Sequence, residues 1–276
     1  MQNSSAQKKH GRRSAATRAA ASIVFGLLAT SWSATAALIS LGEADSFAVL
    51  GASTVTNTGA TVVNGDLGVS PGTAVTGFGP GVVLNGSIHM NDAIAMQAHA
   101  DAATAYAQLV GETFTTDLSG QNLGSMILTP GVYHFATTAQ LTGTLTLDTG
   151  GDPNAAFHFQ IGTTLTTDPG SMITLLNGSS ANIFWQVGTS ATIGVDSTFY
   201  GNILADQSIT VDSGATINGR AIAINAAVTL DTDIINSPVV AEPGTWFSGA
   251  LAVGVIALTE RRRAQKFLVN LSRRGS

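Results

Sequence analysis

The chain of 276 residues contains no cysteine, so disulfide bridges and thiolate metal sites are excluded. Charged residues make up only 11% of the sequence and aromatic residues 6%. Lysine is absent between Ala37 and Val240, where fifteen acidic residues face one arginine, Arg220, for a net charge of −14. A body this acidic repels phosphate, which argues against nucleic-acid binding. With 44% hydrophobic residues, the chain can nevertheless bury a large core.

The other basic residues lie at the two ends of the chain. At the N-terminus, five of them precede the apolar run 19–29 and the small residues 34–36. This order is typical of a secretory signal peptide, which we predict to span residues 1–36 and to be cleaved after Ala36. The alternative is a short membrane helix, but eleven apolar residues fall short of the roughly 20 that a spanning helix needs. The pair Arg12-Arg13 is compatible with twin-arginine export.

Residues 239–276 are predicted to form a linker and a C-terminal sorting tail. Glu242, Pro243 and Gly244 precede the apolar segment 246–258, which is followed by the arginine cluster 261–263. As a helix, thirteen apolar residues would be about 20 Å long, shorter than the roughly 30 Å hydrocarbon core of a bilayer. The tail resembles the PEP-CTERM signal of Gram-negative bacteria, although Ala241 replaces the first proline. This resemblance implies cleavage by a membrane transpeptidase and delivery to the cell envelope or exopolysaccharide matrix.

A short phrase recurs five times in the second half of the chain: an aliphatic residue, Thr or Gly, usually another aliphatic residue, and then Asp. The five aspartates are Asp148, Asp168, Asp196, Asp212 and Asp231, separated by 20, 28, 16 and 19 residues. One short strand ending in a turn thus recurs about once per coil, as in a solenoid. Because a strand alternates its faces, the aliphatic residues should point inward, and threonines such as Thr146 and Thr210 outward.

Other patterns set the order of elements. Residues 37–86 alternate Thr, Val, Asn and Gly in a strand-like way, and a helix is predicted at about 91–110, capped by Asn91 or Asp92. Its apolar stripe is Ile94, Ala98, Ala102, Ala105 and Leu109. Strands resume near Val132, and the sequence 159–163 recurs as 185–189, which predicts stacked aromatic residues and a glutamine ladder between neighbouring coils. The coils before and after the helix must pack into one body to share a core.

Several of these segments together resemble the ice-binding-like family of secreted microbial proteins. They are residues 63–73, the helix beginning near Asp92, residues 128–133 and residues 199–231. The resemblance extends from about Leu41 to Pro238, so residues 37–238 are interpreted as one ice-binding-like domain. It implies a mainly β fold, a discontinuous right-handed parallel β-helix with one long α-helix alongside. The implied activity is adsorption to ice through a flat Thr/Ser/Ala-rich face.

Threonine suits such a face because its β-branched side chain is stiff, so little entropy is lost on contact with an ordered surface. Stacked strands also repeat at about 4.8 Å, which makes a regular array. Some family members carry a four-residue pattern on the binding face: Thr first, Ala or Gly second, any residue third, and Thr or Asn fourth. Segment 58–61 matches it fully, and segments 189–192 and 213–216 match it with one change each. The predicted ice-contacting residues are Thr54, Thr56, Thr58, Thr61, Thr189, Thr192, Ser213 and Thr216.

No catalytic residue, metal site or cofactor is predicted. The histidines at 89, 99, 134 and 158 are scattered, and the recurring aspartates are interpreted as turn caps, with calcium binding as the alternative. Parallel β-helices also include polysaccharide lyases and hydrolases, but a lyase needs a basic residue and Arg220 stands alone. The alternative to ice binding is a structural or adhesive protein of the envelope or exopolysaccharide matrix. Charges, Tyr or bulky apolar residues that interrupt the face would favour it.

Overall fold

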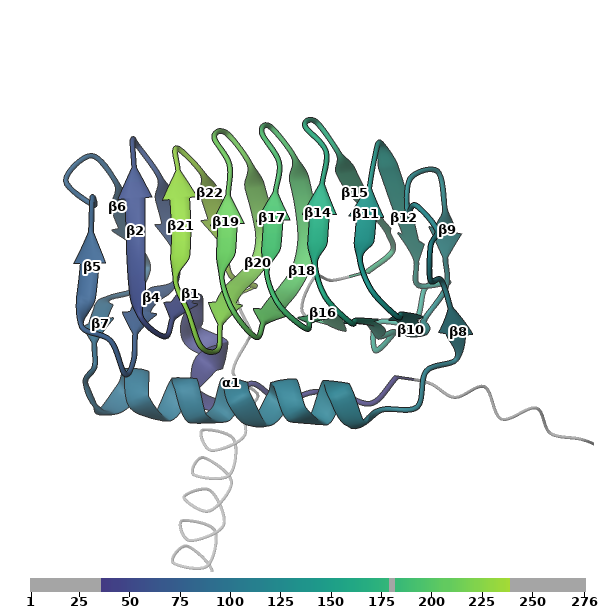
Figure 1. The fold of residues 1–276 in the computed structure, drawn as a ribbon, viewed down its shortest axis with the longest axis horizontal. Helices are drawn as coiled ribbons and strands as arrows, with labels where there is room; N and C mark the ends of the chain where they lie inside the picture. The colour runs from purple at the N-terminus through teal and green to yellow at the C-terminus, as the bar shows by residue number, and fades with distance from the viewer. Residues whose placement is uncertain (1–35, 179–181, 239–276) are drawn as a thin grey trace, which may run out of the picture. The chain divides into compact units, whose positions relative to one another are not determined.

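The computed structural model describes residues 36–178 and 182–238. The predicted signal peptide, apart from Ala36, and the predicted sorting tail lie outside these residues. Within them the chain forms one α-helix, a 3-10 helix η1 (Gly42–Ser46) and parallel strands, each pairing with strands of neighbouring coils (Figure 1). The predicted mainly β solenoid with one helix alongside is therefore confirmed. Each coil contributes to three sheets, which we call sheets 1, 2 and 3.

Sheet 1 is a single layer of seven strands that faces the viewer in Figure 1. In spatial order its strands are β5 (Ala74–Thr76), β2 (Thr54–Thr58), β21 (Val228–Asp231), β19 (Ile209–Val211), β17 (Ala191–Ile193), β14 (Leu165–Thr167) and β11 (Ala139–Leu141). Inward residues such as Val55, Val228 and Ile209 are fully buried. The recurring phrase seen in the sequence supplies several of these strands, with its aliphatic residues inward as predicted.

Sheets 2 and 3 meet at two long strands that belong to both, β18 (Thr198–Ala205) and β20 (Thr216–Ala223). Their first halves pair within sheet 2, which also contains β6 (Val82–Leu84), β3 (Val62–Asn64), β22 (Ile234–Asn236), β15 (Met172–Leu176), β12 (Thr144–Asp148) and β9 (Ile127–Leu128). Their second halves pair within sheet 3, with β7 (Ile88–Met90), β4 (Asp66–Val69), β1 (Phe47–Gly51), β16 (Ile183–Val187), β13 (Phe157–Ile161), β10 (Gly131–Phe135) and β8 (Thr116–Asp117). Gly201 occupies the corner of β18, where a side chain would collide with Ile183 and Trp185.

The order of coils in space differs from their order in the sequence. The first coil, β1 to β3, lies between the coil of β4 to β6 and the last coil, which ends in β22, and β7 lies beyond β4. The chain then returns along α1 (Ala93–Gly111) to the far end and builds the remaining coils back toward the first. The two sets of coils predicted from the sequence therefore form one body with a continuous core.

Helix α1 packs along sheet 3, as the alanine-rich stripe predicts. Its N-cap is Asp92, whose Oδ1 accepts a hydrogen bond from the Ala95 backbone N–H at 2.9 Å. The buried residues of α1 are Ala95, Ala98, Ala102, Ala105 and Leu109. The prediction for Ile94 was wrong: its side chain is 45% exposed, because the stripe passes through Ala95 instead.

The repeated aromatic and glutamine positions behave differently from each other. The rings of Phe159 and Trp185 stack with centroids 3.7 Å apart, which confirms the predicted stacking. Gln160 and Gln186 are aligned on neighbouring strands as predicted, but their side chains do not bond to each other. Gln160 Nε2 donates to the carbonyl oxygens of Leu109 and Glu112 at 2.7 and 2.8 Å, and Gln186 Nε2 donates to the Tyr106 hydroxyl at 2.9 Å. These side chains bind the helix because they lie on the outer side of sheet 3.

Candidate functional site

A row of six threonines runs across the outer surface of sheet 1. The strand register aligns them directly, one from each of six adjacent strands. In spatial order the threonine row is Thr76, Thr56, Thr229, Thr210, Thr192 and Thr166, continued by Gln140 on β11. Five of them lie between two buried residues, and Thr76 follows the half-buried Val75, so their side chains point to solvent. The row therefore presents hydroxyl and methyl groups at a spacing of about 4.8 Å.

A second row of small residues runs parallel to the threonine row, two residues earlier along the chain in each coil. This flanking row consists of Ala74, Thr54, Ala227, Ser208, Ser190 and Thr164. Backbone hydrogen bonds from Leu165 N–H to Ser190 O and from Ala191 N–H to Ser208 O continue the ladder here. The hydroxyls of Ser190 and Ser208 are 3.0 Å apart, within hydrogen-bond distance. Neither row contains a charged residue, a bulky apolar side chain or an aromatic ring.

Aspartates border this surface on the opposite side of the threonine row. Two residues after it come Thr58, Asp231, Asp212, Gly194 and Asp168 on successive strands. The turn beyond β21 buries one further carboxyl group, Asp233, which is 1% exposed and accepts a hydrogen bond from the Asp231 backbone N–H at 2.6 Å. Burial raises the pKa of Asp233 to about 7. The uncharged surface is thus two rows wide and ends at an acidic edge.

The predicted residues divide into three groups. Thr56 and Thr192 belong to the threonine row and Thr54 to the flanking row. Thr189 precedes Ser190, and its hydroxyl donates to the Thr163 carbonyl at 3.0 Å. Thr58 lies at the acidic edge, paired with Asp231. Ser213 lies in the turn after β19, and Thr216 lies on β20 in sheet 2.

The prediction for Thr61 requires a correction, because this residue is fully buried. Its hydroxyl donates to Asn57 Oδ1 at 2.5 Å and accepts from the Asp233 backbone N–H at 3.1 Å. Segments 58–61 and 213–216 match the family pattern in sequence, but both cross the corner from sheet 1 to sheet 2. In segment 189–192, Ser190 and Thr192 lie on the outer surface of sheet 1.

Four members of the threonine row were missed as site residues: Thr76, Thr166, Thr210 and Thr229. The signal that could have identified three of them was present, since Thr166, Thr210 and Thr229 each occupy the second position of the recurring phrase. That position alternates with buried aliphatic residues and must face outward. Only the strand register shows that these residues align with Thr56 and Thr76, which are distant in sequence.

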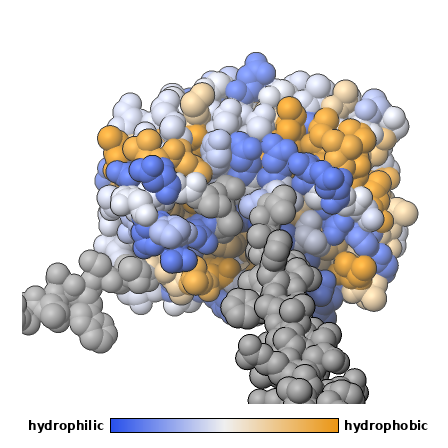
Figure 2. All heavy atoms as spheres, turned by 180° about the vertical axis from the view of Figure 1, so that it is seen from behind, coloured by the Kyte–Doolittle hydropathy of each residue, from blue (hydrophilic) through white to orange (hydrophobic). Residues whose placement is uncertain are grey.

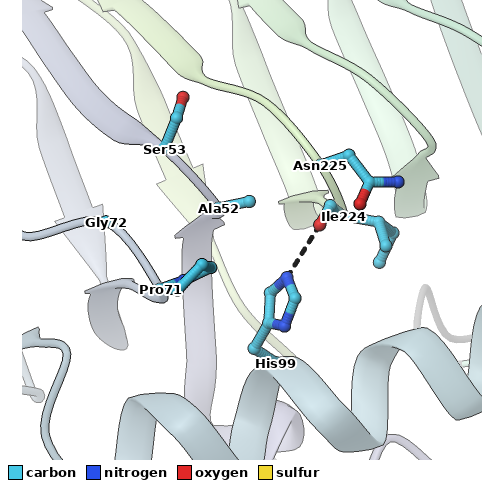
Figure 3. Close-up of a pocket in the computed structure, with 7 residues that line it drawn as sticks. All are labelled: Ala52, Ser53, Pro71, Gly72, His99, Ile224 and Asn225. Atoms are coloured by element: carbon cyan, nitrogen blue, oxygen red, sulfur yellow. Dashed lines mark hydrogen bonds between the residues drawn. The ribbon is translucent and has the colours of Figure 1, made fainter.

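A shallow cleft of about 460 Å³ between α1 and the corner below sheet 1 is lined by Ala52, Ser53, Pro71, Gly72, His99, Ile224 and Asn225 (Figure 3). Its single titratable group, His99, is bound through Nε2 to the Ile224 carbonyl at 2.7 Å. Across residues 36–178 and 182–238, no three His, Cys, Asp or Glu side chains are placed to hold a metal ion. In the same ranges, no helix is long and apolar enough to cross a membrane.

A regular, uncharged surface across a sheet of a solenoid is typical of a protein that binds an extended, ordered surface. The comparisons with known proteins agree with this class. The model of the ice-binding-like family matches residues 49–236. The chain belongs to the ice-binding-like family.

Relatives and solved structures extend this result. An ice-binding protein of Nostoc sp. (strain HG1) is 52% identical over 75% of this chain and 77% of its own length. One from Flammulina populicola is 34% identical over 77% of this chain and 94% of its own length. The crystal structure of an ice-binding protein from an Antarctic biological consortium has a TM-score of 0.71 and 46% identity, covering 73% of this chain and 92% of that one.

Proposed function

We propose that this protein adsorbs to ice through the outer surface of sheet 1, and so inhibits ice growth or recrystallisation. The observation that supports this proposal is the uninterrupted pair of rows, six threonines beside six small residues, without a charge. The methyl groups can order water over them while the hydroxyl groups anchor it, and the β-sheet backbone holds both in place before contact.

The alternative, a structural or adhesive matrix protein without ice affinity, is less well supported by this surface. Charged or bulky side chains in the two rows would have favoured that role, and none is present. Charges would orient water strongly in patterns foreign to ice.

The test compares two threonine-to-tyrosine substitutions on opposite sides of one solenoid. Thr210→Tyr places a ring in the middle of the threonine row, and Thr216→Tyr places the same ring on sheet 2 as the matched control. Because a ring would hold the flat surface away from ice, we expect Thr210→Tyr to lose most of the thermal hysteresis. We expect Thr216→Tyr to retain it.

Ice-crystal growth in a nanolitre osmometer measures both variants, and circular dichroism checks that both fold. Loss of hysteresis in the control alone would place ice contact on sheet 2. Rounded ice discs at high concentrations of the unmodified protein would reject ice adsorption and support the matrix role.

We further propose that the protein is exported, with cleavage after Ala36, and sorted to the envelope or extracellular matrix of a Gram-negative host. Glu242, Pro243 and Gly244 would mark the second processing point. The support is the order of charged, apolar and small residues at each end of the sequence. Mass spectrometry of the protein recovered from the cell surface would give both termini, and intact ends would contradict this proposal.

A further inference from the structure

The outer side of sheet 2 carries exposed apolar residues toward both of its ends, with threonines and asparagines between them. Two aligned rows cross it, one through Val82, Val62, Ile234, Thr216, Thr198, Met172 and Thr144, the other through Leu84, Asn64, Asn236, Asn218, Tyr200, Thr174, Thr146 and Ile127. Neither row contains a charge. Five of these large apolar residues are between 43% and 70% exposed: Val82, Leu84, Ile234, Met172 and Ile127. Figure 2 shows this side, with orange patches near both ends of the face.

This surface differs from sheet 1 in a way that indicates a covering element. Its asparagines bond to one another, with Asn236 Nδ2 3.2 Å from Asn218 Oδ1 and Asn85 Nδ2 2.8 Å from Asn64 Oδ1. The exposed apolar side chains at the two ends of the face have no such partners, and exposed apolar patches of this kind can mark interaction sites. Sheet 3 of the same solenoid already buries its outer side under helix α1.

The described chain ends beside this surface. Ser237 donates its backbone N–H to the Asn64 carbonyl at 3.0 Å, and the Pro238 carbonyl accepts from Arg220 Nη2 at 3.4 Å. Arg220 is 1% exposed and forms an ion pair with Asp45 at 2.7 Å. A buried, paired guanidinium thus fixes the exit point at the end of β22, where sheets 2 and 3 meet. Thirty-eight residues follow, including the apolar segment 246–258.

We propose that the apolar segment 246–258 docks lengthwise on the outer side of sheet 2. The Pro243-Gly244 pair favours a turn that would send the chain back over the sheet. From β22 to β9 there are five strand spacings, about 24 Å, and a thirteen-residue helix is about 20 Å long. In the other direction only β3 and β6 remain, about 10 Å. The length of the segment therefore sets its direction, toward β9.

Charge complementarity agrees with that direction. The arginine cluster 261–263 follows the apolar segment and would arrive near β12 and β9. There Asp148 ends β12, and Asp152 lies in the next turn with its side chain exposed. Opposite charges would thus meet at the far end of the docked segment. On this path the tail would cover Met172 on β15 and Ile127 on β9 until sorting machinery or a membrane removes it, and Val82 and Leu84 on β6 would stay exposed.

A second copy of the chain fits this surface less well. Eight strands spaced about 4.8 Å apart, with about 10 Å of each strand in the two rows, give the face a projected area of roughly 400 Å² per copy. Stable protein interfaces usually bury about 800 Å² on each partner. A single helix needs a strip of about this size, so the estimated area favours the tail as the occupant.

The absence of native cysteine allows a direct test in the full-length chain. One variant carries Thr198→Cys on sheet 2 and Ala252→Cys in the apolar segment, about two strand spacings along the docked path. The matched control carries Thr210→Cys on sheet 1 with the same Ala252→Cys. Both are oxidised at micromolar concentration, and intramolecular disulfide formation is followed by gel mobility and mass. Docking raises the effective concentration of one pair only, so we expect the sheet 2 pair to form at least about tenfold faster.

Each other outcome overturns the proposal. Equal rates in the two variants would show that the segment does not reside on sheet 2. A disulfide-linked dimer from Thr198→Cys alone would identify a second copy as the occupant. Thr216→Cys serves as a replacement if Thr198→Cys fails to fold. Adding Asp148→Lys should slow the sheet 2 pair in low salt, and an unchanged rate would reject the charge contact. The result does not depend on ice binding.

Discussion

Replacing Asp233 by asparagine should change the pH dependence of stability. The carboxyl group is 1% exposed, its Oδ2 accepts from the Asp231 backbone N–H, and its Oδ1 lacks a hydrogen-bond partner within the described residues. Burial is the main cause that raises its pKa to about 7, and the charges of Asp231 and Asp212 add to it. Asparagine keeps the acceptor for Asp231 and cannot ionise.

The magnitude follows from the linkage between protonation and folding. An aspartate in the unfolded chain has an ordinary pKa of 3.8, the folded value is about 7, and each pH unit between them corresponds to about 1.4 kcal/mol. Below pH 4 both states are protonated and the carboxyl group carries no penalty. As the pH rises from about 4 to about 7, the unfolded state loses its proton first, so stability falls by up to about 4 kcal/mol and then stays constant.

Urea unfolding of the parent and Asp233→Asn at pH 4 and pH 8 measures this effect. The asparagine variant should gain stability relative to the parent between these pH values, by about 2 to 4 kcal/mol. At pH 4 it should be slightly less stable than the parent, since its amide group has two N–H donors without a partner where the protonated carboxyl group has one O–H. Asp152→Asn, at an exposed position, is the control and should show little change at either pH. A difference between Asp233→Asn and the parent that is the same at both pH values would refute the reasoning.

Two further predictions concern the core, and both are measured by urea unfolding. Arg220→Met removes a buried guanidinium that binds Asp45, Asn202 and Pro238. Because their polar groups lose this partner, we expect the free energy of unfolding to fall by about 3 to 5 kcal/mol. An unchanged free energy of unfolding would show that the ion pair makes no net contribution. Trp185→Ala removes a fully buried ring that stacks on Phe159 and donates to the Tyr200 carbonyl at 3.0 Å, and should cost about 3 to 5 kcal/mol. A cost below about 1 kcal/mol would mean that the coils collapse into the space.

Local periodicity accounts for what could be predicted about the fold. The alternation of aliphatic residues with threonine in the recurring phrase reports which side of a strand is buried, and alanines at helical spacing identify α1. Both signals depend on neighbours within one element. The prediction that Ile94 is buried was wrong because the local pattern allows either Ile94 or Ala95 to extend the alanine stripe, and tertiary packing buries Ala95.

The candidate site was predicted in part. Thr54, Thr56 and Thr192 lie in the two rows, whereas the family pattern led to Thr61, which is buried, and to Thr216, which lies on another sheet. A four-residue pattern does not state whether a chain is crossing a corner. Shifting a strand by one residue reverses every side chain, so a motif match without register cannot place a residue on a face.

The amino-acid sequence alone established the class of fold, the single helix and its cap, and a body with almost no basic residues. These properties follow from composition and short-range periodicity, which act within a few residues. Which threonines form one surface depends on how the coils stack. Thr56 and Thr229 are 173 residues apart in sequence, yet their hydroxyls lie 3.3 Å apart, because the last coil inserts beside the first. Parallel pairing between distant strands has no local signature, so the surface exists only once the coils have stacked.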